Sequence, residues 1–238
     1  MCWRALRVVL HALFGLAQIL LLFPRLSQAQ RNLRVQAWAC LMLERMGVEL
    51  QVSGTPPARG PLLLVANHIS WLDIVVMHAA RHCRFVAKSE VRHWPLVGTL
   101  ATGGGTLYIE RASRRDALRV VHHMAQALKD GDIVAVFPEG TTGDGASLLP
   151  FHANLIQAAI SAHAPVQPVA LQFIDGRTGA PSHAMSYIGD ESLVGSVWRT
   201  LSARQVRAVV SFGVPQQADG RDRRAWAKDL HATIAGML

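Results

Sequence analysis

Hydrophobic and polar residues are arranged in short alternating blocks from residue 48 onward. Brief apolar runs bounded by turn-forming residues alternate with segments of helical periodicity. This arrangement is typical of an α/β domain in which helices cover a β-sheet. The predicted strands span residues 49–52, 62–66, 84–87, 106–109, 133–137, 166–173 and 206–212.

Two helices are predicted in the same region from apolar residues three or four apart. In residues 113–130, Ser113 and Asp116 have the spacing of a helix-capping box. The C-terminal residues 222–238 repeat the pattern with Trp226, Leu230 and Ile234. We therefore expect a mixed β-sheet flanked by helices.

The amino-terminal segment has a different character. Residues 8–23, VVLHALFGLAQILLLF, are almost continuously apolar but somewhat short for a membrane crossing, which needs about 20 residues. One interpretation is a cleaved signal peptide with Ser27-Gln28-Ala29 as the small-residue cleavage site. A second is a single span, since the arginines after the run outnumber those before it. A third is a helix buried in one leaflet.

The next segment favours membrane association without signal cleavage. Leu33, Ala37 and Leu41 recur at helical spacing, which is typical of a helix at a lipid interface. We therefore expect a membrane-associated two-helix motif over residues 1–47, followed by one domain over residues 48–238. A helix pair packed into a soluble core is the alternative, and the unbroken ILLLF run argues against it.

Composition narrows the class of partner. Half of the 238 residues are hydrophobic and the formal net charge is +8, which suits a protein held against an anionic surface. Phospholipid, nucleic acid and a phosphorylated substrate are the candidates. Nucleic acid is disfavoured because the basic residues are scattered and no recognition motif accompanies them.

Metal and disulfide chemistry are not predicted. Cys2, Cys40 and Cys83 have no paired spacing, which indicates incidental thiols in a reducing compartment. The adjacent His122 and His123 have no acid or cysteine at ligand spacing on the same helix face. We therefore expect no metal site.

Candidate chemistry begins with NHISWLDI, residues 67–74, directly after a predicted strand. Imidazole can accept a proton near neutral pH, and a carboxylate bonded to the far ring nitrogen fixes its tautomer. His68 and Asp73 are five residues apart, so a regular helix would separate them. They can meet only if a loop after the strand leads into a helix near Ser70.

Three further motifs follow in a fixed order: GTLYIER at residues 105–111, FPEGT at 137–141 and APVQPVAL at 164–171. Each is weak alone. Together, behind an apolar amino terminus, they resemble the glycerolipid acyltransferase family that includes bacterial 1-acyl-glycerol-3-phosphate acyltransferases. The resemblance covers residues 62–173, and the family's His-x4-Asp signature falls on His68 and Asp73, with Tyr108 in place of a usual Phe.

The resemblance implies a membrane-bound O-acyltransferase on the cytoplasmic face of the inner membrane. It would transfer a fatty acyl chain from acyl-CoA or acyl-carrier protein to 1-acyl-glycerol-3-phosphate, giving phosphatidic acid. His68 would be the general base and Asp73 its orienting partner. A thiolate leaves readily, so direct attack needs no serine or cysteine nucleophile and no cofactor. A hydrolase is disfavoured because Gly-x-Ser-x-Gly is missing.

The resemblance also implies a binding set. Lys88 and Arg111 would face an anionic headgroup, and the Gly140 and Thr141 N–H groups would form an anion nest. Glu139 would position the cation or the acceptor. The complete set of predicted substrate-binding residues is Lys88, Gly105, Arg111, Glu139, Gly140 and Thr141.

One departure leaves the acceptor open. Residues 142–145 and 151–154 replace segments that carry cations in many lysophosphatidic acid enzymes, and Asp144 adds a negative charge. The continuation looks more like lyso-ornithine lipid acyltransferases, whose acceptor carries no phosphate. A third hypothesis is a non-catalytic lipid-binding or tethering protein that retains the fold.

Overall fold

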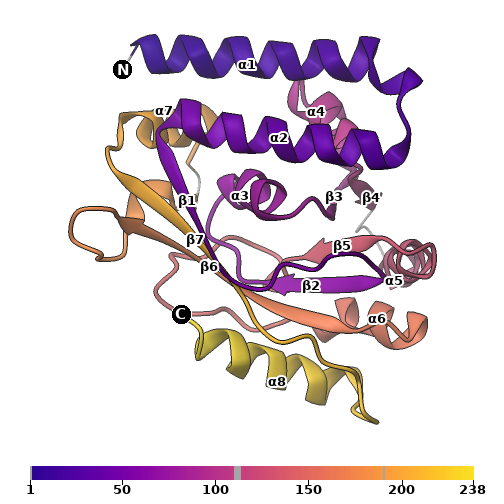
Figure 1. Ribbon diagram of the computed structural model, residues 1–238. Coiled ribbons are helices and arrows are strands. Elements are labelled where there is room, and N and C mark those ends of the chain that lie inside the picture. Colours follow the sequence, from indigo (N-terminus) through magenta and orange to yellow (C-terminus); the bar gives the residue numbers. More distant parts are fainter. Residues whose placement is uncertain (1, 110–113, 190) are drawn as a thin grey trace.

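A seven-stranded sheet organises the computed structural model, which describes residues 2–109, 114–189 and 191–238 (Figure 1). Helices cover both of its faces in layers. The strands are β1 (Val48–Gly54), β2 (Leu62–Ala66), β3 (Arg84–Lys88), β4 (Leu107–Ile109), β5 (Ile133–Val136), β6 (Val166–Asp175) and β7 (Val206–Phe212). All seven predicted strands are therefore confirmed, and their ends differ from the prediction by at most a few residues.

The sheet is mixed, as predicted. Its strand order is β1-β7-β6-β2-β5-β3-β4, and every neighbouring pair is parallel except β6 with β7. Strand β2 lies in the interior of the sheet, and all five of its residues are buried. Because β2 to β6 run the same way, their carboxyl ends meet at one edge of the sheet, where parallel sheets place their sites.

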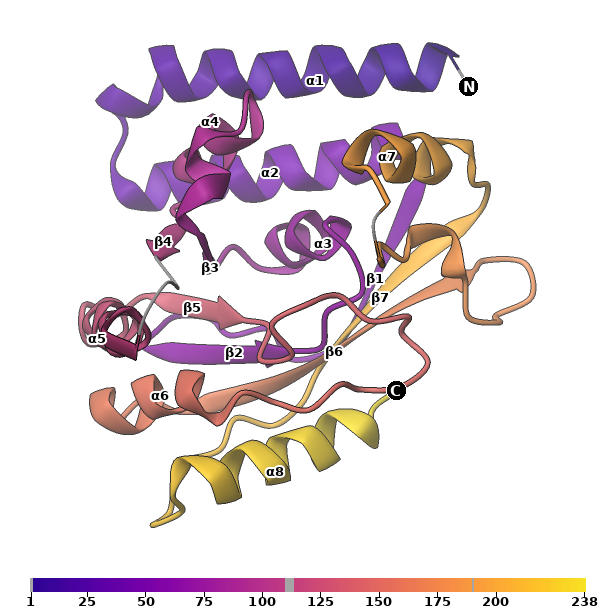
Figure 2. The same ribbon diagram turned by 180° about the vertical axis from the view of Figure 1, so that it is seen from behind.

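Two hydrophobic cores lie on opposite faces of β2. Leu62, Leu64 and Ala66 pack on the side of the helices α2 and α3, while Leu63 and Val65 pack on the side of α5, α6 and α8. Figures 1 and 2 show the resulting layers. The helices are α1 (Cys2–Leu21), α2 (Gln28–Met46), α3 (Leu72–Ala80), α4 (Val97–Gly103), α5 (Arg114–Lys129), α6 (Gln157–Ala162), α7 (Leu193–Ser202) and α8 (Arg223–Ala235).

Local sequence signals set the helix boundaries. Ser27 and Gln30 form a reciprocal capping box at the start of α2, and Gly47 ends it at φ 72°, a conformation that glycine adopts without strain. Asp222 caps α8 by accepting two backbone N–H bonds. The predicted cap of α5 at Ser113 lies outside the described residues.

The amino-terminal helices form a pair above the sheet, as Figure 1 shows. His11 and Trp38 join them reciprocally: the His11 Nε2 lies 2.9 Å from the Trp38 carbonyl, and the Trp38 indole N–H donates to the His11 carbonyl at 3.1 Å. Helix α2 has two apolar faces. The predicted Leu33 and Leu41 point outward, while a second row packs into the core with Ala39, Met42, Leu43 and Met46.

Candidate active site

The His68 and Asp73 side chains meet where β2 ends. After Ala66 the chain makes a short loop, and α3 begins at Leu72, two residues after the predicted start near Ser70. The loop brings the His68 Nδ1 within 2.8 Å of the Asp73 Oδ2, as the predicted loop-to-helix geometry requires.

Asp73 is fixed by the same loop. Its Oδ2 also accepts the backbone N–H groups of Ile69 at 2.6 Å and Ser70 at 2.9 Å, and the residue is completely buried. Three donors thus converge on one oxygen and hold the carboxylate in a single position. A buried, immobile carboxylate then holds the imidazole in one orientation, with Nδ1–H directed at Asp73 and Nε2 left for a substrate.

His68 is restrained on three further sides. Its backbone N–H donates to the Glu139 Oε1 at 2.8 Å, and its carbonyl accepts the Gly143 N–H at 2.8 Å. The imidazole lies flat on the Phe137 ring, with centroids 4.0 Å apart and planes 6° from parallel. Phe85 extends this stack from β3, with its centroid 5.6 Å from that of Phe137. The ring is thus set in both position and plane.

Glu139 lies inside the protein, where it joins two loops. Its Oε1 accepts the His68 N–H, its Oε2 accepts the Leu149 N–H at 3.0 Å, and the residue is only 5% exposed. Burial raises the pKa of this carboxyl, and the two backbone hydrogen bonds oppose that rise. This geometry directs both carboxylate oxygens at the backbone of the site.

The other predicted binding residues differ in whether they reach the cavity beside His68. Lys88 ends β3, is exposed and lines the main cavity. Gly105 turns the chain at φ 83°, and its carbonyl accepts the Arg84 Nε–H at 2.8 Å. The Gly140 N–H donates to the Phe137 carbonyl at 3.1 Å, so the turn itself uses this predicted nest donor. Thr141 is exposed beside it, and Arg111 lies outside the described residues.

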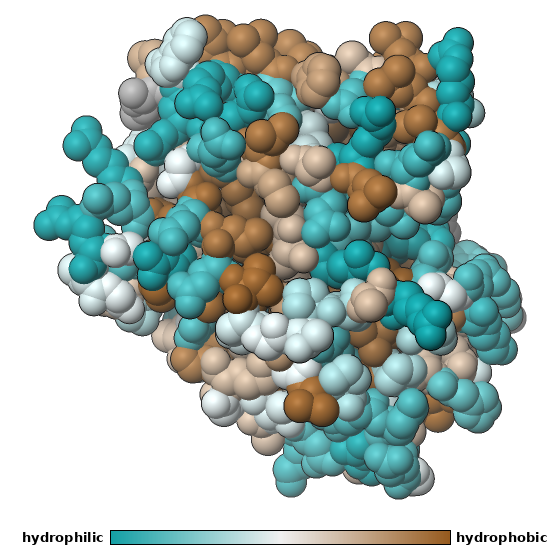
Figure 3. Space-filling model, viewed as in Figure 1, coloured by the Kyte–Doolittle hydropathy of each residue, from teal (hydrophilic) through white to brown (hydrophobic). Residues whose placement is uncertain are grey.

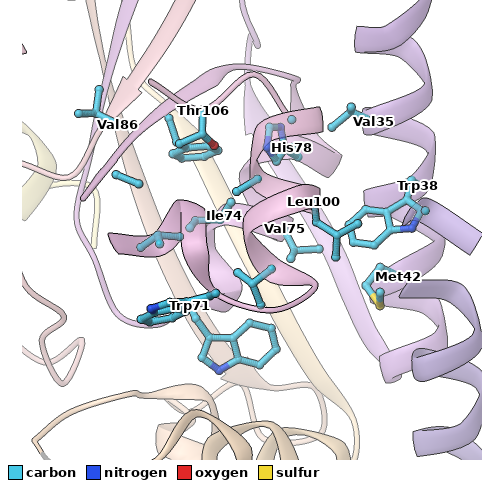
Figure 4. A pocket seen from close by; sticks show the side chains of 18 of the residues that line it. Val35, Trp38, Met42, Trp71, Ile74, Val75, His78, Val86, Leu100 and Thr106 are labelled. Carbon is cyan, nitrogen blue, oxygen red and sulfur yellow. The ribbon is translucent and has the colours of Figure 1, made fainter. Parts of the chain in front are cut away.

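A cavity of about 480 Å³ opens beside His68. Its walls come from α1, α2, α3, α4 and α7 and from strand β3, and apolar side chains dominate them. In Figure 4, Trp38 and Met42 of α2 face Val75 of α3 and Leu100 of α4. The volume is typical of a small-molecule site, and the apolar lining suits a hydrocarbon chain with one end at the imidazole.

The arrangement suits general-base catalysis by His68. Among residues 2–109, 114–189 and 191–238, no three His, Cys, Asp or Glu side chains gather closely enough to hold a metal ion. The histidine can take a proton from a hydroxyl group at Nε2 while Asp73 stabilises the imidazolium.

Sequence reasoning missed several residues around the site. The stacking of Phe137 was not foreseen, nor was helix α7, whose Ser196 Oγ accepts the Trp71 indole N–H at 3.1 Å. A signal for α7 was present: Ser192 precedes apolar residues four apart, and its side chain caps the helix. The apolar residues are Leu193, Val197 and Leu201.

Comparisons with known proteins show which family the chain belongs to. The family profile described as Acyltransferase matches residues 48–172. The chain is 36% identical to a lyso-ornithine lipid O-acyltransferase of Pseudomonas aeruginosa, over 92% of this chain and 85% of that protein. It is also 36% identical to a 1-acyl-sn-glycerol-3-phosphate acyltransferase of Neisseria gonorrhoeae, over 87% of this chain and 82% of the relative.

A solved structure shares the fold at lower sequence identity. The 1-acyl-sn-glycerophosphate (LPA) acyltransferase of Thermotoga maritima superposes with a TM-score of 0.64 at 20% identity, covering 98% of this chain and 97% of that one. At this identity the likeness establishes the mixed α/β fold.

Proposed function

The chain belongs to the Acyltransferase family, and on that basis we propose that it is a membrane-bound O-acyltransferase using an acyl thioester. The proposed acceptor is the free hydroxyl of 1-acyl-glycerol-3-phosphate, giving phosphatidic acid. The observation that best supports this proposal is the 2.8 Å contact between His68 Nδ1 and Asp73 Oδ2, beside an apolar cavity that His68 lines. The apolar cavity holds an acyl chain while the imidazole activates the acceptor oxygen.

The proposed reaction is a single displacement. The acceptor O–H donates its proton to the His68 Nε2 as its oxygen attacks the thioester carbonyl carbon. The C–O bond forms, the C–S bond breaks, and the thiolate leaves with the electron pair. The imidazolium, stabilised by Asp73, returns the proton to the thiolate, so that atoms and charge balance. Both acyl-CoA and acyl-carrier protein present such a thioester.

Membrane association is part of the proposal. Helix α1 has the length and composition of a membrane span, and most of its surface is exposed. Apolar side chains gather along α1 at the top of Figure 3. The most exposed include Trp3, Leu6, Leu10, Leu13 and Phe14. We place the protein at the inner membrane with its catalytic domain on the cytoplasmic face, where acyl thioesters are made.

A lyso-aminolipid such as lyso-ornithine lipid is the second candidate acceptor. The loop after Glu139 contains no cation in residues 140–149, and its Asp144 carboxylate caps the Ala146 N–H at 2.8 Å. A headgroup without phosphate does not need cations there. This candidate is supported by that loop and by the 36% identity to the lyso-ornithine lipid O-acyltransferase of Pseudomonas aeruginosa.

Purified wild-type protein in mixed micelles tests the proposal. It is offered both lyso-lipids together, with palmitoyl-CoA or palmitoyl-carrier protein, and the esters are measured by mass spectrometry. We expect ester formation that falls at least about 100-fold in His68→Ala and in Asp73→Asn. His231→Ala, distant from the site, is the matched control. Turnover by correctly folded His68→Ala at the wild-type rate would overturn the assignment.

A further inference from the structure

Residues 183–189 and 191–202 lie beyond the region matched by the family profile, yet contact the catalytic loop. They contain a short 3-10 turn (His183–Met185) and helix α7 (Leu193–Ser202). In Figure 2, α7 lies above the strands β1 and β7. We call residues 183–189 and 191–202 the brace.

The first contact runs through the backbone of Tyr187. Its N–H donates to the Ile69 carbonyl at 3.0 Å, and its carbonyl accepts the hydroxyl of Thr142. Ile69 follows His68 in the chain and donates its own N–H to Asp73. Tyr187 therefore ties together the loop after β2 and the loop after β5, which are the two loops that hold the proposed base.

The second contact runs through Ser196 on α7. This serine is completely buried, and its Oγ accepts the Trp71 indole N–H at 3.1 Å. Trp71 is the residue before α3 and stands two positions ahead of Asp73. The brace thus restrains the start of the helix that carries the carboxylate.

Arg199 holds the brace in this position. Its guanidinium donates to the carbonyls of Ala184, at 3.1 Å, and Ser186. It also makes a bidentate ion pair with Glu191, at 2.6 and 2.8 Å. The planar fork of arginine suits such a multidentate arrangement, and lysine could not reproduce it. Arg199 therefore fixes the turn that delivers Tyr187 to Ile69.

We propose that Arg199 and Ser196 are positioning residues for the His68–Asp73 pair, which act through the Tyr187–Ile69 and Trp71–Ser196 hydrogen bonds. Neither needs to touch substrate. Catalysis falls steeply when a base is misplaced by even a fraction of an ångström to one ångström, so a loosened loop lowers turnover more than binding. This proposal rests on the proposed function for its kinetic readout.

The chain offers a matched control on the opposite side of the sheet. Arg221 also ties a loop together: its guanidinium donates to the Ala218 carbonyl at 2.9 Å, to the Gln216 side chain at 3.0 Å and to Asp229 at 3.1 Å. It lies at the start of α8, on the face opposite the catalytic loop. Arg221→Met and Arg199→Met therefore remove comparable sets of bonds.

The kinetic experiment compares Arg199→Met, Arg199→Lys, Ser196→Ala and Arg221→Met in purified full-length protein. We expect Arg199→Met and Ser196→Ala to lower kcat roughly 5- to 50-fold while the KM values for donor and acceptor stay within about twofold. Arg199→Lys should have a kcat close to that of Arg199→Met, because lysine cannot make the same set of bonds. Arg221→Met should lower the melting temperature without changing kcat. Equal kcat losses in Arg199→Met and Arg221→Met would overturn the proposal.

A second readout does not depend on turnover. The His68 ring is followed by NMR, with its resonances assigned by comparison with His68→Gln. A looser contact with Asp73 weakens the hydrogen bond at Nδ1, so the Nδ1–H resonance of His68 should shift or broaden in Arg199→Met relative to wild type. It should not change in Arg221→Met. An unchanged Nδ1–H resonance in folded Arg199→Met refutes the brace, whereas an inactive wild type refutes the proposed function.

Discussion

The imidazole of His68 lies flat against the phenyl ring of Phe137, with ring centroids 4.0 Å apart and planes 6° from parallel. Phe137 is the first residue of the FPEGT motif, and its ring is the surface on which the His68 imidazole stacks. Two residues later, the Glu139 carboxylate of the same motif accepts the His68 backbone N–H. The strand end of β5 therefore sets the plane of the imidazole, while Asp73 sets its rotation.

Replacing the Phe137 ring should reduce turnover. In Phe137→Leu, the apolar volume is largely kept but the flat face is lost, so the imidazole can tilt away from the acceptor oxygen. We expect kcat to fall about 10-fold with little change in either KM. Phe151→Leu, which alters an edge contact with His231 elsewhere, is the control. Equal kcat values for the two variants would show that the stack has no part in orientation.

Glu139→Gln should destabilise the fold as well as the site. A glutamine side chain has one acceptor oxygen, so either the His68 N–H or the Leu149 N–H must face an NH2 group. Leaving a buried donor unsatisfied costs about 1–3 kcal/mol. Urea denaturation compared with that of exposed Glu44→Gln measures the loss. Unchanged stability together with a raised acceptor KM would instead mean that Glu139 contacts the substrate.

Gly15→Ala should shorten the preferred acyl chain. A Cβ at Gly15 would lie 2.5 Å from the Trp38 indole nitrogen, so the indole must move, and both residues line the cavity. We expect the ratio of rates for long and short acyl-CoA donors to fall. Gly236→Ala, where the nearest atoms would be 3.6 Å away, is the control. An unchanged chain-length profile would place the acyl chain away from Trp38.

Acid should destabilise the protein through two stacked histidines. Burial lowers the pKa of His78 to about 3, with the neighbouring His82 adding to the effect. Burial also lowers the pKa of His82 to about 4, where Arg81 and Arg84 reinforce the shift and Asp132 opposes it. Both values lie below the unfolded value of 6.5, so stability present above pH 6.5 is lost as the pH falls toward the folded values.

Denaturation at pH 7 and pH 5 measures this loss. Each histidine contributes up to about 2 kcal/mol of destabilisation at pH 5, because only the unfolded chain takes up the proton there. His82→Phe should therefore lose less stability than wild type between the two pH values. The exposed His122→Ala should keep the wild-type difference. An identical loss in His82→Phe would mean that His82 is protonated in the folded state.

Much of the fold was readable because the signals were local. The continuous apolar run of residues 62–66 predicts a strand buried on both faces, and β2 is such a strand. The meeting of His68 and Asp73 was also predictable, since the spacing excludes a regular helix and the motif fixes which residues must converge. The amino-terminal helix followed from its hydrophobicity, and α1 matches it.

The rest depended on contacts between distant parts of the chain. Nothing around Glu139 reveals that its carboxylate turns inward to the His68 backbone, 71 residues earlier in the chain. The hydrogen bond between Trp71 and Ser196 joins residues 125 apart. Such pairings are set by how strands assemble, which periodicity does not encode.

The order of strands in the sheet indicates which parts of the site can change in sequence without disturbing the fold. The proposed base follows β2, which has paired neighbours on both sides, whereas Arg111, one of the two cations predicted for the headgroup, follows β4 in the sequence, and β4 is a three-residue strand at the sheet margin. Changes at the margin disturb few ladder bonds. A lineage with this fold can therefore exchange the lipid it modifies by remodelling the margin of the sheet, while the proton-transfer residues stay attached to a buried interior strand.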